Sequence, residues 1–390
     1  MIEKIDRLVK ENKDYVINLR RHFHMNPEPS WKEYETSKRV KQELEKMNIP
    51  YMSIADTGII ATIKGNKEGK TVALRADMDA LEIQEEGDRE YKSKKDGLMH
   101  ACGHDGHTAM LIGAAKVLNG MKEEINGTVK LLFQPAEEMV QGAKKIIEEN
   151  GLKGIDNIFG MHLWSDLETG KINCEKGPRM AAGDYVIIDI EGVGGHGSMP
   201  HQGVDAGVIT AAFLLNIQSV VSREMSPLDS VVLSFGKINT GTRFNVIPSK
   251  AHIEGTARCF SNEIQDDLPK IIKRYGDYLA KSYRGKFHLE YLKGTPPTIN
   301  EEISVEIATS AVKSFLGEEA LVSFEKLTGS EDMAYYLNEI PGAIAFIGCR
   351  NEEKGSNYPQ HHSKFDIDED SLGIGTELYV RYAVGFLNQE

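Results

Sequence analysis

Apolar residues recur along this chain at two spacings, one typical of helices and one typical of strands. Residues 1–50 show helical spacing that is interrupted at Asn26-Pro27-Glu28-Pro29. A second helical segment, 108–118, is flanked by apolar runs of strand length, which are Thr71–Arg75, Gly127–Phe133 and Asn157–His162. Strands that alternate with helices predict an α/β fold. We expect a three-layer sandwich with a mixed, largely parallel sheet.

The pattern changes between residues 184 and 294. Here several strands surround two helical segments, a long apolar one at Ala206–Val221 and an amphipathic one at Glu263–Lys281. Breaker-rich sequences lie on both sides, Gly177-Pro178 before this region and Gly294-Thr295-Pro296-Pro297 after it. After residue 303 helix and strand alternate again. The sequence therefore predicts an α/β domain in two parts, 1–183 and 295–390, with an inserted α+β domain at 184–294.

Composition and charge narrow the classes of function. The chain has 390 residues, of which 40% are hydrophobic and 27% charged, as in ordinary globular proteins. Its formal net charge of −13 repels phosphate backbones and anionic lipids, so we expect neither a nucleic-acid nor a membrane partner. The most apolar stretch, Gly207–Leu215, is about half of the ~20 residues that span a bilayer, and we expect a buried core helix there. Four scattered cysteines and a charged N-terminal segment favour the cytoplasm.

The densest group of candidate ligands is His100-Ala-Cys102-Gly-His104-Asp-Gly-His107. One isolated histidine is more often only solvated, but three with a cysteine and an aspartate in eight residues favour metal binding. A second interpretation is a thiol nucleophile, because the imidazole of His104 would lower the pKa of Cys102. That interpretation leaves the other acidic and histidine groups without a role.

Adjacent carboxylates follow the strand 127–133 in Gln134-Pro-Ala-Glu137-Glu138. Neighbouring side chains point in different directions, so one can bind a metal while the other moves protons. A hydrolytic metal site needs such a base beside the water that the cation acidifies. The alternative is an acidic turn at the start of a helix, which the helix dipole favours.

Three weaker signals remain. His162 ends the strand 157–162, and His361-His362 lies in a polar loop; each alone is more often structural than a ligand. The inserted domain carries a glycine-flanked histidine loop, Gly192–His201. It lacks the Lys-Ser/Thr of a P-loop, and no dinucleotide-binding unit opens the chain, so we do not expect a phosphate-binding loop here. We expect it to be either a simple turn or a mobile loop that presents an imidazole to a substrate oxyanion.

Taken in order, these motifs resemble those of the metal-dependent amidohydrolases that include hippurate hydrolase, N-acetyl-amino-acid deacetylases and plant auxin–amino-acid hydrolases. This group is also similar to aminoacylases and zinc carboxypeptidases with a two-metal site and a dimerising lid domain. The resemblance covers nearly the whole chain. It rests on R-A-D-M-D-A-L (75–81), H-A-C-G-H-D-G-H (100–107), Q-P-A-E-E (134–138), G-M-H (160–162), G-G-H-G-S-M-P-H (194–201), N-V-I-P (245–248), G-S-E-D (329–332) and the His361 loop.

The resemblance implies two divalent ions per chain, with the thiolate of Cys102 shared between them. Mixed sulfur, nitrogen and oxygen donors admit Zn, Mn, Co or Ni. His361 is preferred over its neighbour because the ligand in family members lies four residues before the aromatic residue that Phe365 matches. The implied ligands are Cys102, His104, Glu138, His162 and His361.

The resemblance also implies catalytic and substrate-binding residues. Glu137 would be the base, and His196, from the lid of a partner chain, would stabilise the oxyanion. Asp79 joins these two in the expected catalytic set. It would act with Asp77 beside the ligands and orient them, because the related carboxypeptidases have a histidine where Asp77 stands. The remaining expected residues hold the substrate carboxylate and are Asn245 and Arg258.

The expected activity is hydrolysis of the amide bond of N-acyl-L-amino acids to a carboxylic acid and a free amino acid. The expected assembly is a homodimer through the lid domain, with a tetramer as a further option. Within the same class, the alternatives are an N-acetyl-diaminopimelate deacetylase, a hippurate hydrolase, and a dipeptidase or carboxypeptidase that acts on small peptides. Outside it, the alternatives are a Cys-His thiol hydrolase and a metal-binding protein without catalysis.

Overall fold

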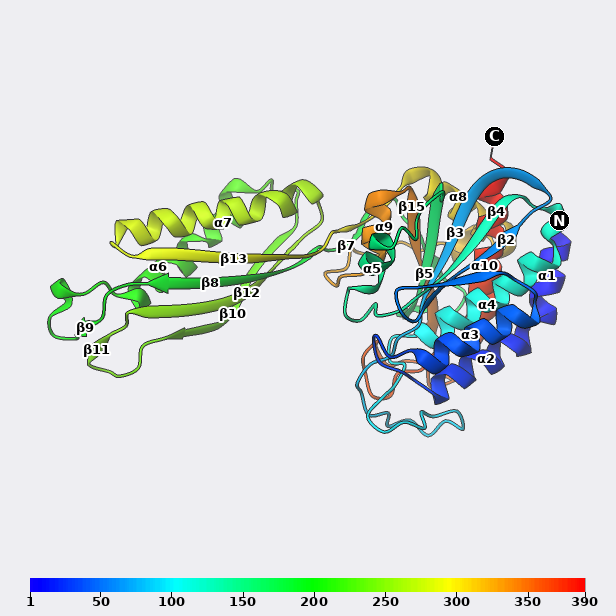
Figure 1. Cartoon of the computed structure of the whole chain (residues 1–390), viewed down its shortest axis with the longest axis horizontal. Coiled ribbons are helices and arrows are strands. Elements are labelled where there is room, and N and C mark those ends of the chain that lie inside the picture. The colour runs from blue at the N-terminus through cyan, green and yellow to red at the C-terminus, as the bar shows by residue number, and fades with distance from the viewer. Residues whose placement is uncertain (390) are drawn as a thin grey trace. The chain divides into compact units, whose positions relative to one another are not determined.

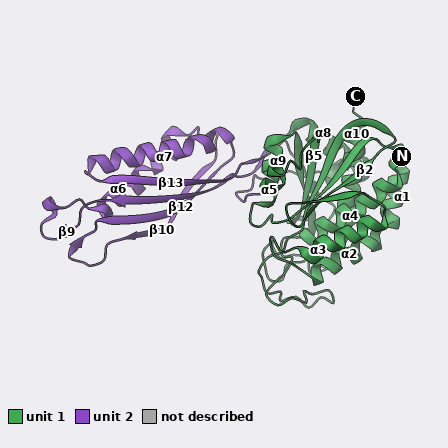
Figure 2. Ribbon diagram, viewed as in Figure 1, with its two compact units in different colours: residues 1–177, 299–325, 332–390 green, residues 178–298, 326–331 purple. Residues whose placement is uncertain are grey.

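The computed structural model describes residues 1–389 and divides the chain into two compact units (Figure 2). Unit 1 comprises residues 1–177, 299–325 and 332–390, and unit 2 comprises residues 178–298 and 326–331. The expected inserted domain, 184–294, lies within unit 2. Unit 2 also contains the short segment 326–331, which the composition of the sequence did not mark as part of the insertion.

A seven-stranded mixed sheet forms the centre of unit 1 (Figure 1). Its strand order is β1-β2-β4-β3-β5-β15-β6, and the four strands β4, β3, β5 and β15 are parallel to one another. The strands at both ends pair antiparallel with their neighbours. The strands are β1 (Tyr51–Ile54), β2 (Gly58–Lys64), β3 (Lys67–Asp77), β4 (Asn126–Gln134), β5 (Asn157–Glu168), β6 (Ile172–Asn173) and β15 (Gly342–Arg350), and the short β14 (Thr298–Asn300) pairs with β7 (Gly177–Met180).

Helices cover both faces of this sheet, as the alternation of strands and helices in the sequence predicts (Figure 1). Helices α4 and α10 pack on one face, with α1, α2 and α3 around α4, while α5 and α9 pack together on the other face. The fold class expected from the sequence is confirmed. The helices of unit 1 are α1 (Ile2–Glu11), α2 (Lys13–Met25), α3 (Tyr34–Lys46), α4 (His104–Gly120), α5 (Gly142–Glu148), α8 (Glu302–Phe315), α9 (Met333–Glu339) and α10 (Asp370–Leu387).

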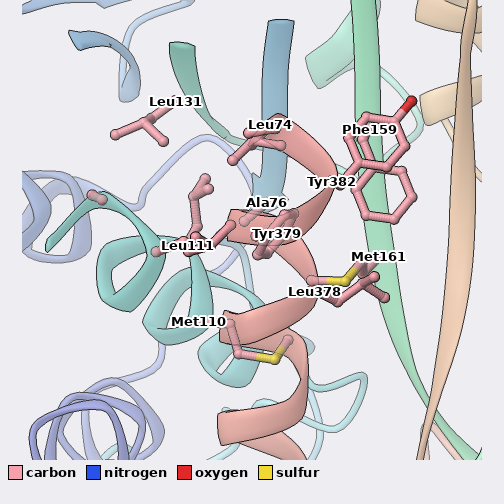
Figure 3. Packing of buried hydrophobic residues seen from close by; sticks show 14 of the residues in the cluster. Leu74, Ala76, Met110, Leu111, Leu131, Phe159, Met161, Leu378, Tyr379 and Tyr382 are labelled. Atoms are coloured by element: carbon pink, nitrogen blue, oxygen red, sulfur yellow. The ribbon is translucent and has the colours of Figure 1, made fainter. Parts of the chain in front are cut away.

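The two faces of the sheet divide the strand residues between a hydrophobic core and the site. Leu74 and Ala76 of β3 point toward Met110 and Leu111 of α4 and toward Tyr379 of α10 (Figure 3). The intervening residues of β3 point to the opposite face. On that face, near the carboxyl end of β3, the side chains are charged: they are Arg75 and Asp77.

The order in which strands are added to the sheet reverses at β3. From β3 the chain passes through α4 to β4 on one side, and from β4 it passes through α5 back across β3 to β5 on the other side. Open α/β sheets bind ligands beyond the carboxyl ends of the strands at such a point. Candidate site residues lie there, because Asp77 ends β3, Glu137 and Glu138 follow β4, and the ligand His104 begins α4.

Unit 2 is a four-stranded antiparallel sheet with both of its helices on one face. Apolar side chains alternate along its strands and pack beneath the helices, while the other face of the sheet is open. The order is β10-β12-β8-β13, so β10 is an edge strand. The elements are β8 (Gly183–Glu191), β9 (Gly195–His196), α6 (Ala206–Asn216), β10 (Val231–Thr240), β11 (Val246–Ile247), β12 (Lys250–Cys259), α7 (Asn262–Ser282) and β13 (Lys286–Thr295).

The expectation of a buried core helix at 207–215 holds for one face of α6 and is wrong for the other. Ile209 and Phe213 are buried on the sheet, but Val208 and Leu215 are 48% and 77% exposed. The segment Ala206–Glu224 also has the length and apolar character of a membrane-crossing helix, with 33% of its most apolar window buried. A single such segment is weak evidence for a membrane span, because core helices share these properties. An apolar face without a partner within this chain explains the pattern equally well.

A buried ion cluster fixes the N-terminal helices to the start of α4. The guanidinium of Arg20 donates to Asp105 and Asp366, each at 2.8 Å, and the ring of His24 lies 2.7 Å from the same oxygen of Asp105. Arg20 and Asp105 are both fully buried. Burial alone would raise the pKa of Asp105, but Arg20 and then His24 hold it far below its usual range. The residue next to Asp105 is the expected ligand His104.

We expect Arg20→Met to lower the free energy of unfolding by about 3–5 kcal/mol, because it leaves two buried carboxylates without their cation. Urea unfolding followed by tryptophan fluorescence measures this change. Both tryptophans of the chain, Trp31 and Trp164, belong to unit 1, so the signal reports on that unit.

The neighbouring Arg21→Met is the matched control. Arg21 pairs with Glu369, but its side chain is 39% exposed, so its loss should cost less than about 1 kcal/mol. Equal effects of the two substitutions would show that the buried cluster does not determine the stability of unit 1.

Candidate metal centre

The five expected ligands form two groups that share one atom, the Sγ of Cys102. Within each group the potential ligand atoms all lie within 4.8 Å of one another. Cys102 immediately precedes Gly103, whose φ of +93° favours glycine and turns the chain into α4. The two groups are Cys102, His104 and His162, and Cys102, Glu138 and His361. A thiol shared by two sets of donors can bridge a pair of ions.

The ligand-side nitrogens of two histidines are set by hydrogen bonds on the opposite side of each ring. Nδ1 of His104 donates to the carbonyl oxygen of Asp79 at 2.9 Å, and Nδ1 of His162 donates to that of Leu163 at 2.7 Å. In the neutral rings, Nε2 therefore carries the lone pair that a metal would bind. Nε2 of His162 lies 3.5 Å from Sγ of Cys102. Such bonds orient histidine ligands in metal sites.

Buried polar atoms in this region fit a metal site. Among residues 1–389, Nε2 of His104 and Oε1 of Glu138 are buried and have no hydrogen-bond partner, and they lie 3.9 Å apart. Burial raises the pKa of Glu138 to about 7, and it raises the pKa of the Cys102 thiol well above its usual value. Unpaired buried acceptors are costly, and a cation between them removes that cost. The donor set therefore fits divalent ions.

Two carboxylates stand beside Nε2 of His104. Oε2 of Glu137 lies 4.0 Å away, about as far as the nearest oxygen of Glu138. Glu138 also lies 3.7 Å from Nε2 of His361, so it faces both ligand groups, whereas Glu137 faces the His104 side. This difference supports the expected division into one ligand and one base.

Asp79 holds the turn that carries these carboxylates. Its side chain is buried and accepts the backbone N–H groups of Glu137 at 3.1 Å and Glu138 at 3.0 Å. Its other partners are the hydroxyl of Ser30 at 2.6 Å and Nδ1 of His104, 3.3 Å from Oδ1. The structure thus places Asp79 behind the ligands. A positioning role fits these contacts better than a place in the catalytic set.

Asp77 lies between two other polar groups. Its Oδ1 is 2.6 Å from Nδ1 of His107, and its Oδ2 accepts from Arg75 at 2.7 Å. Nε2 of His107 accepts the backbone N–H of Leu163 at 2.8 Å, so both nitrogens of this ring are engaged. Burial would raise the pKa of Asp77, but His104, Arg75 and His107 together hold it well below its usual value. These contacts support the expected orienting role of Asp77.

Of the two histidines in the last loop, the structure brings His361 to the ligands. Its backbone has a φ of +64°, and its N–H donates to the carbonyl of Ala101 at 2.7 Å, beside Cys102. The ring of His362 instead stacks on Tyr358 with centroids 4.6 Å apart. The His361 side chain is 54% exposed, which leaves this edge of the site open to solvent.

His196 and Asn245 lie together in unit 2, at one end of its sheet. His196 is opposite Val246 in the β9–β11 pair, and the carbonyl of Asn245 accepts the N–H of Gly197 at 2.9 Å. The backbone N–H of Ser198 donates to Nδ1 of His196 at 3.1 Å. The proton of the neutral ring is therefore on Nε2, where it can be donated to a substrate oxygen.

Arg258 lies at the other end of the same sheet. It stands near the end of β12, whereas Asn245 and His196 lie beside its first residue, Lys250. Eight residues of strand separate Lys250 from Arg258, a span of roughly 26 Å. Its guanidinium donates to Thr256 and, at 2.9 Å, to the carbonyl of Ala257. Within a single copy of unit 2, Arg258 and Asn245 are therefore too far apart to contact the same small substrate.

The analysis of the sequence missed a buried chain of positioning groups. Asp332 accepts from Arg75 and from Gln134, each at 2.8 Å, and from the backbone N–H of Ala143 at 3.0 Å. It therefore joins the start of α9 to β3, β4 and α5. A signal was present, because Arg75 is a cation within an apolar strand and Gly329–Asp332 was among the motifs. Their contact spans 257 residues, which spacing alone does not reveal.

Comparison with known proteins agrees with this geometry. Residues 73–384 match the sequence profile of Peptidase family M20/M25/M40, which is most of the chain. The chain belongs to this family.

Individual relatives are similar over their whole length. The chain is 39% identical to thermostable carboxypeptidase 2 of Saccharolobus solfataricus, with all of both chains covered. It is 38% identical to an N-acetylcysteine deacetylase of Bacillus subtilis, over 95% of this chain and 96% of the relative. A crystal structure of a dinuclear metal-binding peptidase of the family, also from Bacillus subtilis, is 34% identical, covers 98% of this chain and all of its own, and has a TM-score of 0.86.

These comparisons confirm the family expected from the motifs. They also confirm that the chain is a hydrolase and that its centre takes two divalent metal ions. The role of each residue is not tested by them and stays a prediction.

We expect protein purified without chelator to hold about two divalent ions per chain by elemental analysis. Cys102→Ala should lose metal from both positions, because its sulfur belongs to both ligand groups. Cys349→Ala is the matched control, since that buried cysteine lies on β15 outside both groups. Equal metal contents of the two variants, or full activity without metal, would contradict the shared thiolate.

Proposed function

We propose that this chain hydrolyses the amide bond of N-acyl-L-amino acids and releases a carboxylic acid and a free amino acid. The observation that carries the proposal is the pair Glu137 and Glu138, of which Glu138 faces both ligand groups and Glu137 lies 4.0 Å from Nε2 of His104. A ligand with a separate carboxylate beside it suits hydrolysis, whereas a purely structural metal site needs no such base. The deacetylase relative, by its name, acts on an N-acyl amino acid.

The side chains then have distinct tasks. When bound, the two ions acidify a water molecule and polarise the amide carbonyl. Glu137 takes a proton from the attacking water and returns it to the leaving amine. The Asp79 carboxylate holds the backbone of Glu137, so that the base keeps its position during both transfers.

Unit 2 supplies the groups that bind the substrate. Nε2–H of His196 donates to the oxyanion that forms on the amide carbonyl, and Asn245 beside it contacts the substrate. Arg258 lies at the far end of the sheet. If it and Asn245 bind the same substrate, the two residues must therefore come from different copies of unit 2. We therefore propose that the complete site takes residues from two chains.

The surface of unit 2 supports a dimer formed through this lid. The outer face of α6 exposes Leu215 and Val208, and the edge strand β10 exposes Val232 and Ile238. An edge strand with an apolar helix beside it can pair with a second copy of itself. A cytoplasmic location is part of the same proposal, and four free, buried cysteines are consistent with it.

The thiol-hydrolase alternative loses support, whereas the peptidase alternative remains. A thiol hydrolase needs a thiolate, but burial raises the pKa of Cys102 and the nearby Glu138 raises it further. The nearby imidazole of His104 lowers this pKa, but burial and Glu138 outweigh it, so the thiol stays protonated without a metal. A carboxypeptidase or dipeptidase activity would use the same metal ligands and base. It is the second candidate because one relative is named a carboxypeptidase.

The test is hydrolysis of a panel of N-acyl-L-amino acids and dipeptides by the metal-loaded protein, with free amino acids measured by mass spectrometry. We expect N-acyl amino acids to be cleaved. Glu137→Gln should keep both ions and lose about 10²–10⁴-fold in kcat, because it preserves size and removes the base.

Glu138→Gln is the matched variant, one residue away and with the same chemical change. It should lower metal content, because Glu138 faces both ligand groups. If both variants kept full metal and lost activity equally, the division between base and ligand would be wrong.

The lid contribution is testable by mixing subunits. His196→Ala should lower kcat by about 10²–10³-fold with little change in KM, because the oxyanion exists only in the transition state. A mixed dimer of the His196→Ala and Glu137→Gln chains contains one site with an intact His196 over an intact Glu137. We therefore expect partial recovery of activity after subunit exchange.

Differently tagged chains and pulldown establish that mixed dimers form. Mixing two batches of the same variant is the control and should recover nothing. Mixed dimers without recovery would show that His196 does not act on the partner's site.

A further inference from the structure

Next to the metal centre, unit 1 contains an aromatic cluster that the proposed mechanism does not use. Trp164 lies two residues after His162 on β5, and their ring centroids are 5.5 Å apart. Trp164 stacks on Phe324, with centroids 6.4 Å apart and planes inclined by 9°. Phe346 of β15 meets both rings edge-on, at 5.3 and 5.2 Å. The cluster therefore begins at a metal ligand.

The cluster also reaches the surface of unit 1. Phe346 is fully buried and supports the other two rings from below, while Trp164 and Phe324 are only partly buried. Among residues 1–389, the indole N–H of Trp164 has no hydrogen-bond partner, whereas that of Trp31 donates to Gln141 at 3.2 Å. Trp164 and Phe324 thus offer a rigid, partly exposed aromatic surface beside the reacting centre.

We propose that Trp164 and Phe324 form the surface that contacts the acyl group of the substrate and sets which acyl groups the enzyme prefers. The proposal rests on the proposed hydrolysis of N-acyl amino acids. It assigns flat aromatic acyl groups as the preferred class over small acyl groups such as acetyl.

The charge of the substrate decides which of its two sides meets this surface. On the amine side of the scissile bond, the α-carboxylate is separated from the nitrogen by a single carbon. If the amine side of the substrate lay against Trp164 and Phe324, its α-carboxylate would meet the aromatic ring faces, which are negative. The acyl side carries no charge beside the carbonyl, and an aromatic acyl ring extends the existing stack.

The experiment compares N-benzoyl-L-methionine with N-acetyl-L-methionine, so that only the acyl group differs. The wild-type protein should have the higher kcat/KM for the benzoyl substrate. Trp164→Ala and Phe324→Ala should each lower the benzoyl-to-acetyl ratio of kcat/KM by about tenfold, mainly through KM, because the contact exists before and during reaction. Trp164→Phe should restore most of the ratio.

Tyr34→Ala is the matched control, because Tyr34 is an aromatic residue of unit 1 that is 63% exposed at the start of α3. It should leave the ratio unchanged. A second series, N-acetyl-L-methionine against N-acetyl-L-phenylalanine, tests the amine side. If Trp164→Ala changed this second ratio and not the first, the assignment to the acyl group would be overturned.

A binding measurement makes the test independent of turnover and of any folding defect in the alanine variants. Trp31→Phe leaves Trp164 as the sole tryptophan, and with Glu137→Gln the substrate stays intact. N-benzoyl-L-methionine should change the emission of Trp164 saturably, and N-acetyl-L-methionine should change it much less. Equal responses to both ligands would overturn the proposal.

The two proposals fail in different ways. If the wild-type protein cleaved no N-acyl amino acid, the proposed function would be wrong. If it cleaved them with an acyl preference that Trp164→Ala and Phe324→Ala leave unchanged, the function would stand and the aromatic surface would have no part in specificity.

Discussion

The site depends on the carboxylate of Asp79 more than on any single ligand. This buried group collects the hydroxyl of Ser30, two backbone N–H groups of the turn after β4, and the ring of His104. A buried carboxylate is stable only when its hydrogen bonds are satisfied, so these segments must come together for the fold to form. The same contacts fix the direction of Glu137, Glu138 and His104. Folding therefore sets the geometry of the metal centre before any ion binds.

A second buried chain keeps the strands behind the site in register. Asp332 holds Arg75, Arg75 holds Asp77, and Asp77 holds His107. His107 then accepts the N–H of Leu163, the residue after the ligand His162. Charges alternate from Asp332 through Arg75 to Asp77, so removing Arg75 leaves two buried carboxylates without compensation. The strands that supply ligands are thus coupled through groups that need not touch the metal or the substrate.

Sequence patterns predicted most of the fold, and patterns together with the family resemblance predicted the candidate ligands that the structure brings together. The runs that became β3, β4 and β5 are mostly apolar because both faces of the central sheet are covered. Cys102 and His104 were found because their cluster is dense within one loop. Asp332 and Trp164 were not, because each acquires its partners only when distant segments meet. The exposed face of α6 was missed because apolar composition alone does not distinguish a buried helix from a helix with an exposed apolar face.

If His196, Asn245 and Arg258 all bind substrate, as proposed, the geometry of unit 2 favours a dimer. His196 and Asn245 occupy the end of the sheet opposite to Arg258, and a strand of this length is rigid and far longer than an N-acyl amino acid. A single lid therefore cannot place both ends over one substrate. If both ends contribute, each active site must receive one end from its own chain and the other from a second copy. Catalysis would then require assembly, and the apolar face of α6 would be retained because the complete site exists only in the dimer.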